Sequence, residues 1–149
     1  MVTPFIKEAT VLLETLAAAL IMLTPWNKDR ILVDPFCGSG TFPIEAAMMA
    51  ANMAPGMNRS FLSEDWKNII KRKYWYEAMD EANDLLDDTV KVDIQGYDID
   101  GDIVKAARAN AQSAGVDHMI HFQQRPVNAL SHPKKYGFLI TNPPYGERI

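Results

Sequence analysis

The chain has 149 residues, with 48% hydrophobic and 23% charged side chains and a formal net charge of −4 at pH 7, which is typical of one globular domain with one core. Its longest apolar run is too short to cross a bilayer, its start does not resemble a signal peptide, and its single cysteine, Cys37, excludes an internal disulfide. We therefore expect a cytoplasmic protein without membrane contact. The negative net charge indicates that this segment does not make the main contacts with any nucleic acid.

Helical and strand patterns alternate along the first half of the chain. Apolar residues at three- and four-residue steps predict a helix over residues 5–23, which Thr24-Pro25 ends. A short β-branched run over 31–33 predicts a buried parallel strand that ends at Asp34. A Gly-rich turn follows, and a helix is expected over 43–54 with proline in its first turn.

The second half repeats this alternation. Residues 67–86 could hold one helix, and residues 102–114 predict another, with Gly115 as its stop. The expected inner face of that second helix consists of Ile103, Ala106, Ala107, Asn110 and Ala114. Further strands are predicted over 92–97, 119–123 and 137–141. Strands that alternate with helices predict βαβ units and a doubly wound α/β fold with a parallel sheet.

A glycine-rich loop lies between the first strand and the following helix: Asp34-Pro35-Phe36-Cys37-Gly38-Ser39-Gly40-Thr41. Its glycines permit close backbone approach, and the helix start offers unpaired N–H groups to a carboxylate or phosphate. It lacks the lysine of the phosphate-binding loop and the third glycine of the dinucleotide fingerprint. A zwitterionic ligand fits better, because Asp34 could bind an ammonium group and the backbone amides of the loop could bind a carboxylate. A tight turn without a ligand is the alternative.

Acidic residues follow the second predicted strand. Asp98 ends that strand, where doubly wound sheets commonly place a carboxylate on ribose hydroxyls. Asp100 stands at the start of the next helix and is expected to be its N-cap. Ile99 between them could pack on an adenine face. We therefore favour Asp98 over Asp100 as the ribose ligand.

The last predicted strand runs into Asn142-Pro143-Pro144-Tyr145. Two successive prolines fix φ and remove two donors, so the neighbouring carbonyls stay free to accept hydrogen bonds. Asn142 adds an amide oxygen and Tyr145 a flat ring. This set suits a planar group with an exocyclic amine, such as a nucleobase, although an ordinary Pro-rich turn has the same residues.

Taken together, four motifs resemble one family. They are the loop 34–41, Ile44-Glu45-Ala46-Ala47, Gly96-Tyr97-Asp98-Ile99-Asp100, and Asn142-Pro143-Pro144-Tyr145-Gly146-Glu147-Arg148. This combination resembles the class I S-adenosylmethionine-dependent RNA methyltransferases, and within them the THUMP-associated group that methylates guanine N2 in ribosomal RNA. Members of that group are often labelled N6-adenine-specific DNA methylases. Residues 13–20 and 54–56 extend the resemblance over nearly the whole chain.

The resemblance implies S-adenosylmethionine as cofactor and no metal. It implies that Asp34, Gly38 and Gly40 hold the methionine moiety, that Thr41 and Glu45 line or brace that pocket, and that Asp98 takes the ribose. The remaining cofactor-loop residues are Pro35, Phe36, Cys37 and Ser39, and the expected catalytic residues that hold the target base are Asn142, Pro143, Pro144 and Tyr145. The family usually has an aspartate near the adenine after the third strand. Here residues 123–128 have none, so Asn128 or the backbone would substitute, beside Ile99.

The resemblance also implies a sheet of which this chain holds the half with strand order 3-2-1-4. We therefore expect residues 1–149 to be a partial catalytic domain with little activity alone, without the C-terminal strands and the RNA-binding domain through which ribosomal RNA would be held. The fourth strand would be an edge, through which copies could self-associate.

Several alternatives stay open. An adenine-N6 DNA methyltransferase would use the same Asn-Pro-Pro-Tyr chemistry, and a module that only binds the cofactor or a partner would need no catalysis. Cys37 could attack a pyrimidine, but its place in the cofactor loop favours a packing role. The run Lys71-Arg72-Lys73-Tyr74-Trp75-Tyr76 resembles an RNA-contacting surface, and a solvated helix with aromatic core anchors is the reading we favour. The three histidines show no metal-ligand spacing.

Overall fold

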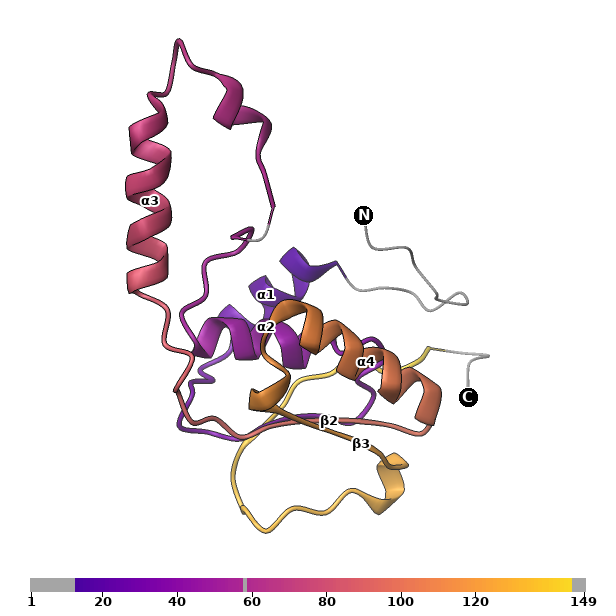
Figure 1. Ribbon diagram of the computed structural model, residues 1–149. Helices are drawn as coiled ribbons and strands as arrows, with labels where there is room; N and C mark the ends of the chain where they lie inside the picture. Colours follow the sequence, from indigo (N-terminus) through magenta and orange to yellow (C-terminus); the bar gives the residue numbers. More distant parts are fainter. Residues whose placement is uncertain (1–12, 58, 146–149) are drawn as a thin grey trace. The chain divides into compact units, whose positions relative to one another are not determined.

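The computed structural model describes residues 13–57 and 59–145. Contacts divide them into two units (Figure 1). Unit 1 holds the described residues up to Ala47 and from Lys91 onward, and unit 2 is Met48–Val90. No helix among the described residues is long and apolar enough to cross a membrane.

Unit 1 is built on a four-stranded parallel sheet with the order β3-β2-β1-β4. Its strands are β1 (Leu32–Asp34), β2 (Ile94–Asp98), β3 (Ile120–Gln124) and β4 (Phe138–Leu139). Leu32 pairs with Ile94 on one side and Phe138 on the other. The predicted fold class and strand order are confirmed, and β4 is an outer strand of the described sheet.

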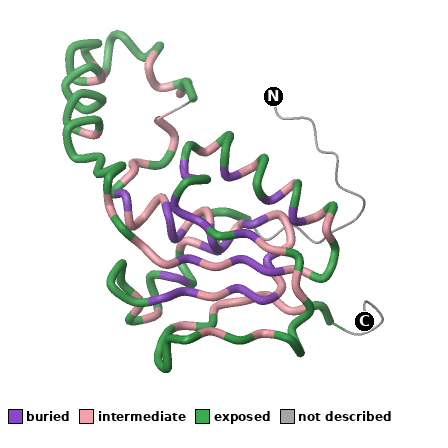
Figure 2. The backbone as a smooth tube through the Cα atoms, turned by 60° about the horizontal axis from the view of Figure 1, so that its bottom comes forward, coloured by how far each residue is buried: buried purple, intermediate pink, exposed green. Residues whose placement is uncertain are grey.

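Three helices accompany the sheet: α1 (Glu14–Met22), α2 (Thr41–Ala50) and α4 (Gly101–Ala114). In Figure 1, α1, α4 and the start of α2 lie on one side of the sheet. The core between these layers is apolar, and Figure 2 marks it as the buried stretches of the strands and of the helix faces turned to them. Its members include Ala17, Ile21, Leu32, Ala46, Ile94, Ala107 and Phe122.

The caps of α4 agree with the sequence. Asp100 Oδ1 accepts hydrogen bonds from the backbone N–H groups of Asp102 (2.8 Å) and Ile103 (3.4 Å), which makes it the predicted N-cap. Gly115 ends the helix in the left-handed region at φ 77°, where a Cβ would be strained. The buried face differs by about one residue from the predicted one. It consists of Val104, Ala107 and Ala111.

Two helix boundaries near the cofactor loop were predicted wrongly. α2 begins at Thr41 instead of Pro43 and stops at Ala50 instead of residue 54. The early stop coincides with Asn52, which takes a left-handed φ of 53° and cannot continue a helix. For the first helix, α1 covers Glu14–Met22, and the predicted residues 5–12 lie outside the described part of the chain.

Unit 2 contains a 3-10 turn, η1 (Leu62–Asp65), and the helix α3 (Arg72–Asp84). The predicted helix over 67–86 is therefore too long, because Lys71 is extended and residues 66–70 form a separate turn around Trp66 O. No residue of η1 or α3 is buried, which Figure 2 shows as a nearly continuous exposed stretch. Phe61 and Trp75 stack at 6.0 Å between ring centres and form the main aromatic contact of this unit.

Candidate cofactor-binding and base-binding site

Strands β1, β2 and β4 are parallel neighbours, so the residues that follow them meet at one edge of the sheet. Asp34 ends β1 and Asp98 ends β2. Ile140 continues the pairing of β4 by donating its N–H to Val33 O at 3.1 Å, and Asn142 follows two residues later. The three sequence motifs with predicted site residues therefore meet at the same edge.

The cofactor loop has the backbone that its glycines predict. Gly38 has φ 52° and Gly40 has φ 87°, both in the region that favours glycine. A Cβ on Gly40 would stand 3.0 Å from Phe122 Cζ and 3.2 Å from Ala107 Cβ, so this glycine lets the loop approach the helix layer. A Cβ on Gly38 would meet nothing within 4 Å. The two glycines thus have different roles, because Gly38 borders open space.

The loop is tied directly to the end of β2. Cys37 N donates to Tyr97 O at 2.8 Å, and Gly38 N donates to Asp98 Oδ2 at 3.2 Å. The other carboxylate oxygen of Asp98 accepts from Asp100 N at 3.0 Å. Asp98 is half-buried beside the cofactor loop, whereas Asp100 uses its carboxylate as a helix cap. This placement favours Asp98 over Asp100 as a ligand residue.

Asp34 has a different environment from the one the sequence suggested. Its side chain is only 2% exposed, and Oδ1 accepts from Thr141 Oγ1 at 2.6 Å and from Phe36 N at 3.1 Å. Burial raises the pKa of Asp34 to about 6, although the hydrogen bonds from Thr141 and Phe36 lower it. The carboxylate is thus directed into the protein, where it joins the end of β1 to the end of β4.

The predicted base-holding residues follow Thr141. Asn142 and Pro143 are half-buried, whereas Pro144 and Tyr145 are exposed, with 74% of Tyr145 accessible. Tyr145 Oη donates to Asn142 Oδ1 at 3.2 Å. An amide oxygen and an accessible ring therefore stand together at the sheet edge. The rest of this motif, residues 146–148, lies outside the described residues.

The other residues of the loop and of α2 provide support. Cys37 is 5% exposed, and burial raises the pKa of its thiol, which disfavours a nucleophilic thiolate. Ser39 Oγ and Thr41 Oγ1 lie 3.2 Å apart, with one of the two hydroxyls donating to the other. Glu45 is half-buried, and burial together with the nearby carboxylate of Glu14 raises its pKa. Pro35 is buried and Phe36 half-buried.

Gln124 is a polar residue beside the predicted adenine position that the sequence motifs did not include. Gln124, at the end of β3, donates from Nε2 to Ile99 O at 2.9 Å and thus holds the segment after Asp98. Ile99 is 70% exposed, as a stacking surface requires. Asn128 is exposed in a short 3-10 turn, η3 (Val127–Ala129). A polar side chain at the end of a parallel strand was the available signal for Gln124.

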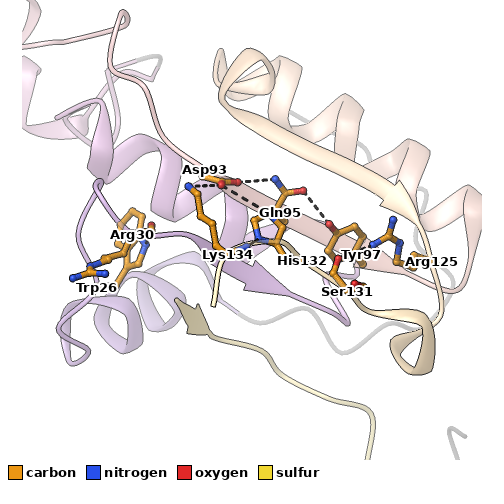
Figure 3. Close-up of polar contacts among 9 residues, drawn as sticks. All are labelled: Trp26, Arg30, Asp93, Gln95, Tyr97, Arg125, Ser131, His132 and Lys134. Carbon is orange, nitrogen blue, oxygen red and sulfur yellow. Dashed lines mark hydrogen bonds and ion pairs between the residues drawn. The ribbon is translucent and has the colours of Figure 1, made fainter. Parts of the chain in front are cut away.

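A chain of polar contacts holds the segment between β3 and β4 against Asp93, Gln95 and Tyr97 of the β2 segment (Figure 3). Lys134 Nζ lies 2.6 Å from Asp93 Oδ2, Gln95 Nε2 donates to Asp93 Oδ1 at 2.7 Å, and Tyr97 Oη donates to Gln95 Oε1 at 3.0 Å. His132 Nε2 lies 3.9 Å from Asp93 Oδ2. Burial raises the pKa of Asp93, but the hydrogen bonds from Lys134 and Gln95 lower it below its usual value overall.

Arg125 extends this chain toward the sheet edge. The guanidinium of Arg125 lies 5.0 Å from the centre of the Tyr97 ring and donates a hydrogen bond to Ser131 O. The backbone N–H of Arg125 donates to Asp98 O. The segment that carries Asn128 is thereby held at the end of β2. A hollow of about 290 Å³ lies against this segment, between Val33, Tyr97, Leu130 and His132, and none of the predicted site residues lines it.

A family model decides the assignment of the chain. Residues 2–149 match the family described as RMKL-like, methyltransferase domain. The chain belongs to this family. The match confirms the family resemblance found in the four motifs and includes both the cofactor loop and the Asn142–Tyr145 segment.

Three similar proteins extend this result. YpsC of Bacillus subtilis is 46% identical over 136 residues, which are 91% of this chain and 35% of YpsC. The ribosomal RNA large subunit methyltransferase K/L of Shewanella woodyi is 46% identical over 141 residues, which are 91% of this chain and 20% of that protein. The crystal structure of SMU.472 complexed with S-adenosylhomocysteine (SAH) has a TM-score of 0.86 and 43% identity, and the match covers 91% of this chain and 36% of that chain. The chain thus spans about a third or less of the length of these relatives.

Proposed function

We propose that the protein transfers a methyl group from S-adenosylmethionine to the exocyclic amine of a nucleobase, with guanine N2 of ribosomal RNA as the target. The observation that supports this most is the meeting of the cofactor loop and the Asn142–Tyr145 segment at one sheet edge, joined through Asp34 and Thr141. Two similar proteins support the cofactor and the substrate, since one was crystallised with SAH and another is named a ribosomal RNA methyltransferase.

The residues at the sheet edge fit such a cofactor. The space beside Gly38 is open to a Cβ, which leaves room for a ligand close to the loop backbone. Asp98 is a half-buried carboxylate next to that loop and would accept from the ribose hydroxyls. Ile99 offers an exposed apolar face to the adenine, with Gln124 holding its carbonyl and Asn128 in the next loop. When bound, S-adenosylmethionine supplies an electrophilic methyl group on a sulfonium.

In this proposal Asp34 does not contact the cofactor and instead positions other residues of the site. A side chain that is 2% exposed has almost no surface for a cofactor ammonium, so direct contact is not the role that its geometry favours. Its carboxylate instead fixes Thr141 and the start of the loop at Phe36. Asp34 is therefore a positioning residue that sets the loop amides and the base-binding segment against each other.

The base-binding segment would position the amine. Asn142 Oδ1 and the Pro143 carbonyl would accept its two N–H groups, and the amine would replace the hydroxyl of Tyr145 that now donates to Asn142. The Tyr145 ring would stack on a base swung out of its neighbours. In-line positioning of this kind supplies up to ~7–11 kcal/mol of a barrier. The nitrogen would gain the methyl group as the bond between that group and the sulfonium sulfur breaks, which leaves SAH, and it would lose one proton to solvent.

The proposal covers only part of a larger catalytic assembly. The relatives carry most of their length outside the matched region, so we place the further sheet strands and the main RNA-binding domain there. The described residues would then bind the cofactor and show little turnover alone, so transfer and turnover are measured in the longer protein that carries these parts. The exposed side of β4 would pair with those strands or with a second copy. A ribosomal RNA substrate would also place the protein in the cytoplasm, in agreement with its single cysteine.

Replacing Asn142 by alanine tests the reaction. We expect SAH binding by calorimetry to stay within about twofold, whereas tritium transfer from labelled S-adenosylmethionine to RNA falls by roughly 100-fold. Asn83→Ala, an exposed asparagine at the end of α3, is the matched control. Equal loss of binding and transfer in Asn142→Ala would remove the proposed role of Asn142. Parallel assays with RNA and DNA, followed by hydrolysis of the product, identify the methylated base, and transfer to DNA adenine alone would overturn the proposal.

A further inference from the structure

Helix α3 exposes aromatic side chains that the sequence analysis had assigned to a core. Tyr74 is 51% and Tyr76 is 61% accessible, and only Trp75 of this aromatic run is half-buried, against Phe61. The expectation of aromatic core anchors is therefore wrong for the two tyrosines. Accessible aromatic rings near the start of a helix, with no core around them, indicate a surface that binds something.

The charges of this part of unit 2 are separated by sign. Residues 66–76 contain four cations and no carboxylate, whereas residues 77–88 contain six carboxylates and no cation. The four cations are Lys67, Lys71, Arg72 and Lys73. No ion pair within the described residues involves them, since the pairs found there are made by Lys105, His132 and Lys134.

This separation opposes the helix dipole. The N-terminus of a helix carries partial positive charge, so Lys71, Arg72 and Lys73 at the start of α3 are destabilising there. Asp84, at the other end of the helix, faces partial negative charge. Helix stability therefore does not explain this arrangement. A binding role for the basic end does explain it.

Arg72, Lys73 and Tyr76 share one face of α3, and Tyr74, two residues from Tyr76 and on a different face, adjoins them through Lys73. Arg72 and Tyr76 are four residues apart and Lys73 and Tyr76 three apart, so they are neighbours on the helix. Lys73 Nζ lies 4.8 Å from the centre of the Tyr74 ring, a cation–π contact that leaves half of the tyrosine accessible. In Figure 1 this end of α3 lies at the tip of unit 2, where the chain turns over from η1.

We propose that this surface, the α3 basic–aromatic patch formed by Lys71, Arg72, Lys73, Tyr74 and Tyr76, binds a single-stranded segment of the RNA substrate. The inference rests on the proposed function, because that function supplies the RNA. The cations contact phosphates, and the tyrosine rings stack on unpaired bases, which a duplex would not present. Part of the RNA contact then lies within this chain, in addition to any domain outside it.

Charge reversal tests the phosphate contacts. Binding of a fluorescently labelled single-stranded RNA oligonucleotide is measured by anisotropy at several salt concentrations, with the full chain. We expect the triple variant Lys71→Glu, Arg72→Glu and Lys73→Glu to bind about tenfold more weakly or worse, with the slope of log K against log salt reduced by about 2. The matched control reverses three exposed lysines of unit 1, Lys28, Lys91 and Lys135, changes the net charge equally, and should alter binding by less than about threefold.

Removing the rings tests the base contacts. Tyr74→Ala and Tyr76→Ala should each weaken RNA binding by roughly fivefold or more, without changing the salt slope. Tyr136→Ala is the control, because Tyr136 is 70% exposed in unit 1 and also lies under a lysine, with Lys135 Nζ 5.5 Å from its ring centre. Circular dichroism confirms that each variant keeps its helices. Unchanged RNA binding in the patch variants would overturn the inference, and a lower unfolding midpoint in those same variants would assign the rings to packing.

The outcome for this surface is separable from the outcome for the reaction. If the unchanged protein methylates RNA and the patch variants bind RNA as it does, the reaction stands and the patch is refuted. If the patch variants lose RNA binding and the longer protein that carries the further strands and RNA-binding domain methylates no RNA, the patch is supported and the proposed reaction is refuted.

Discussion

The carboxylate of Asp34 accepts a 2.6 Å hydrogen bond from the hydroxyl of Thr141, a residue 107 positions later in the chain. Asp34 begins the cofactor loop, and Thr141 directly precedes Asn142. The strands that carry them, β1 and β4, are neighbours in the sheet. The position of the base-binding segment therefore depends on the position of the cofactor loop.

Thr141→Val tests this dependence. Valine keeps the volume of threonine and removes the donor, so we expect turnover to fall by about tenfold while the Kd for SAH changes by less than about threefold. Thr141→Ser restores the hydroxyl and should restore turnover. Thr89→Val is the control, since Thr89 Oγ1 makes a similar 2.8 Å bond to Asp87 on the surface. Initial rates and calorimetry provide the comparison, and unchanged turnover in Thr141→Val would refute the positioning role.

The buried carboxylate predicts a pH dependence of stability. Burial raises the pKa of Asp34 from about 3.8 to about 6, so between these values the folded protein binds more protons than the unfolded chain. The free energy of unfolding should therefore decrease as pH rises from about 4 to about 6, by about 3 kcal/mol from this group, and remain lower above pH 6. Asp34→Asn removes this contribution. Urea unfolding of both proteins across that range measures it, and a constant difference between the two curves would contradict the prediction.

Alanine substitutions at the two glycines of the cofactor loop should affect different properties, namely protein stability at one position and SAH binding at the other. Gly40→Ala forces a Cβ to within 3.0 Å of Phe122 and 3.2 Å of Ala107, and we expect a loss of ~1–3 kcal/mol in the free energy of unfolding. Gly38→Ala meets open space and should cost about 1 kcal/mol of stability, from its φ of 52°. It should nevertheless weaken SAH binding by about tenfold or more, since the methyl group occupies the space proposed for the cofactor. Unchanged SAH affinity in Gly38→Ala would place the cofactor elsewhere.

The two aspartates after β2 form another matched pair. Asp100→Ala removes the N-cap of α4 and should cost about 1 kcal/mol of stability with little effect on SAH binding. Asp98→Asn keeps the shape of the side chain but loses the charged acceptor, and we expect SAH binding to weaken by about tenfold or more. Thermal unfolding and calorimetry distinguish these effects. The reverse pattern would make Asp100 the ligand residue.

Much of unit 1 could be predicted from the sequence, because its signals are local. A β-branched run marked β1, Gly115 marked the end of α4, and Asp100 marked its start. The strand order 3-2-1-4 that the resemblance implied also makes β1 a neighbour of both β2 and β4, which brings Asp34, Asp98 and Asn142 to one edge. These features depend on a few neighbouring residues and on the rule that the carboxyl ends of parallel strands share an edge.

The features that were not predicted depend on distant partners. The burial of Asp34 requires Thr141, and the hold on Ile99 requires Gln124, 25 residues away. The buried stripe of α4 is centred on Ala107, where Phe122 of β3 and Gly40 meet it, and periodicity alone could not fix its rotation to within one residue. In η1 and α3 of unit 2 no residue is buried, so packing does not add to weak local signals there, and the pattern overestimated the length of α3.

The bonds that assemble the site connect residues 60, 71 and 107 positions apart: Gly38 with Asp98, Ser39 with Asn110, and Asp34 with Thr141. No short segment of the chain can form them, and such long-range closures are slow to form during folding. Affinity for SAH would therefore arise late, once all four strands have paired. A saturating ligand would then select the fully folded chain, adding about 2.7 kcal/mol at a hundredfold excess over its Kd. Supplying such a ligand during refolding should raise the yield of native protein.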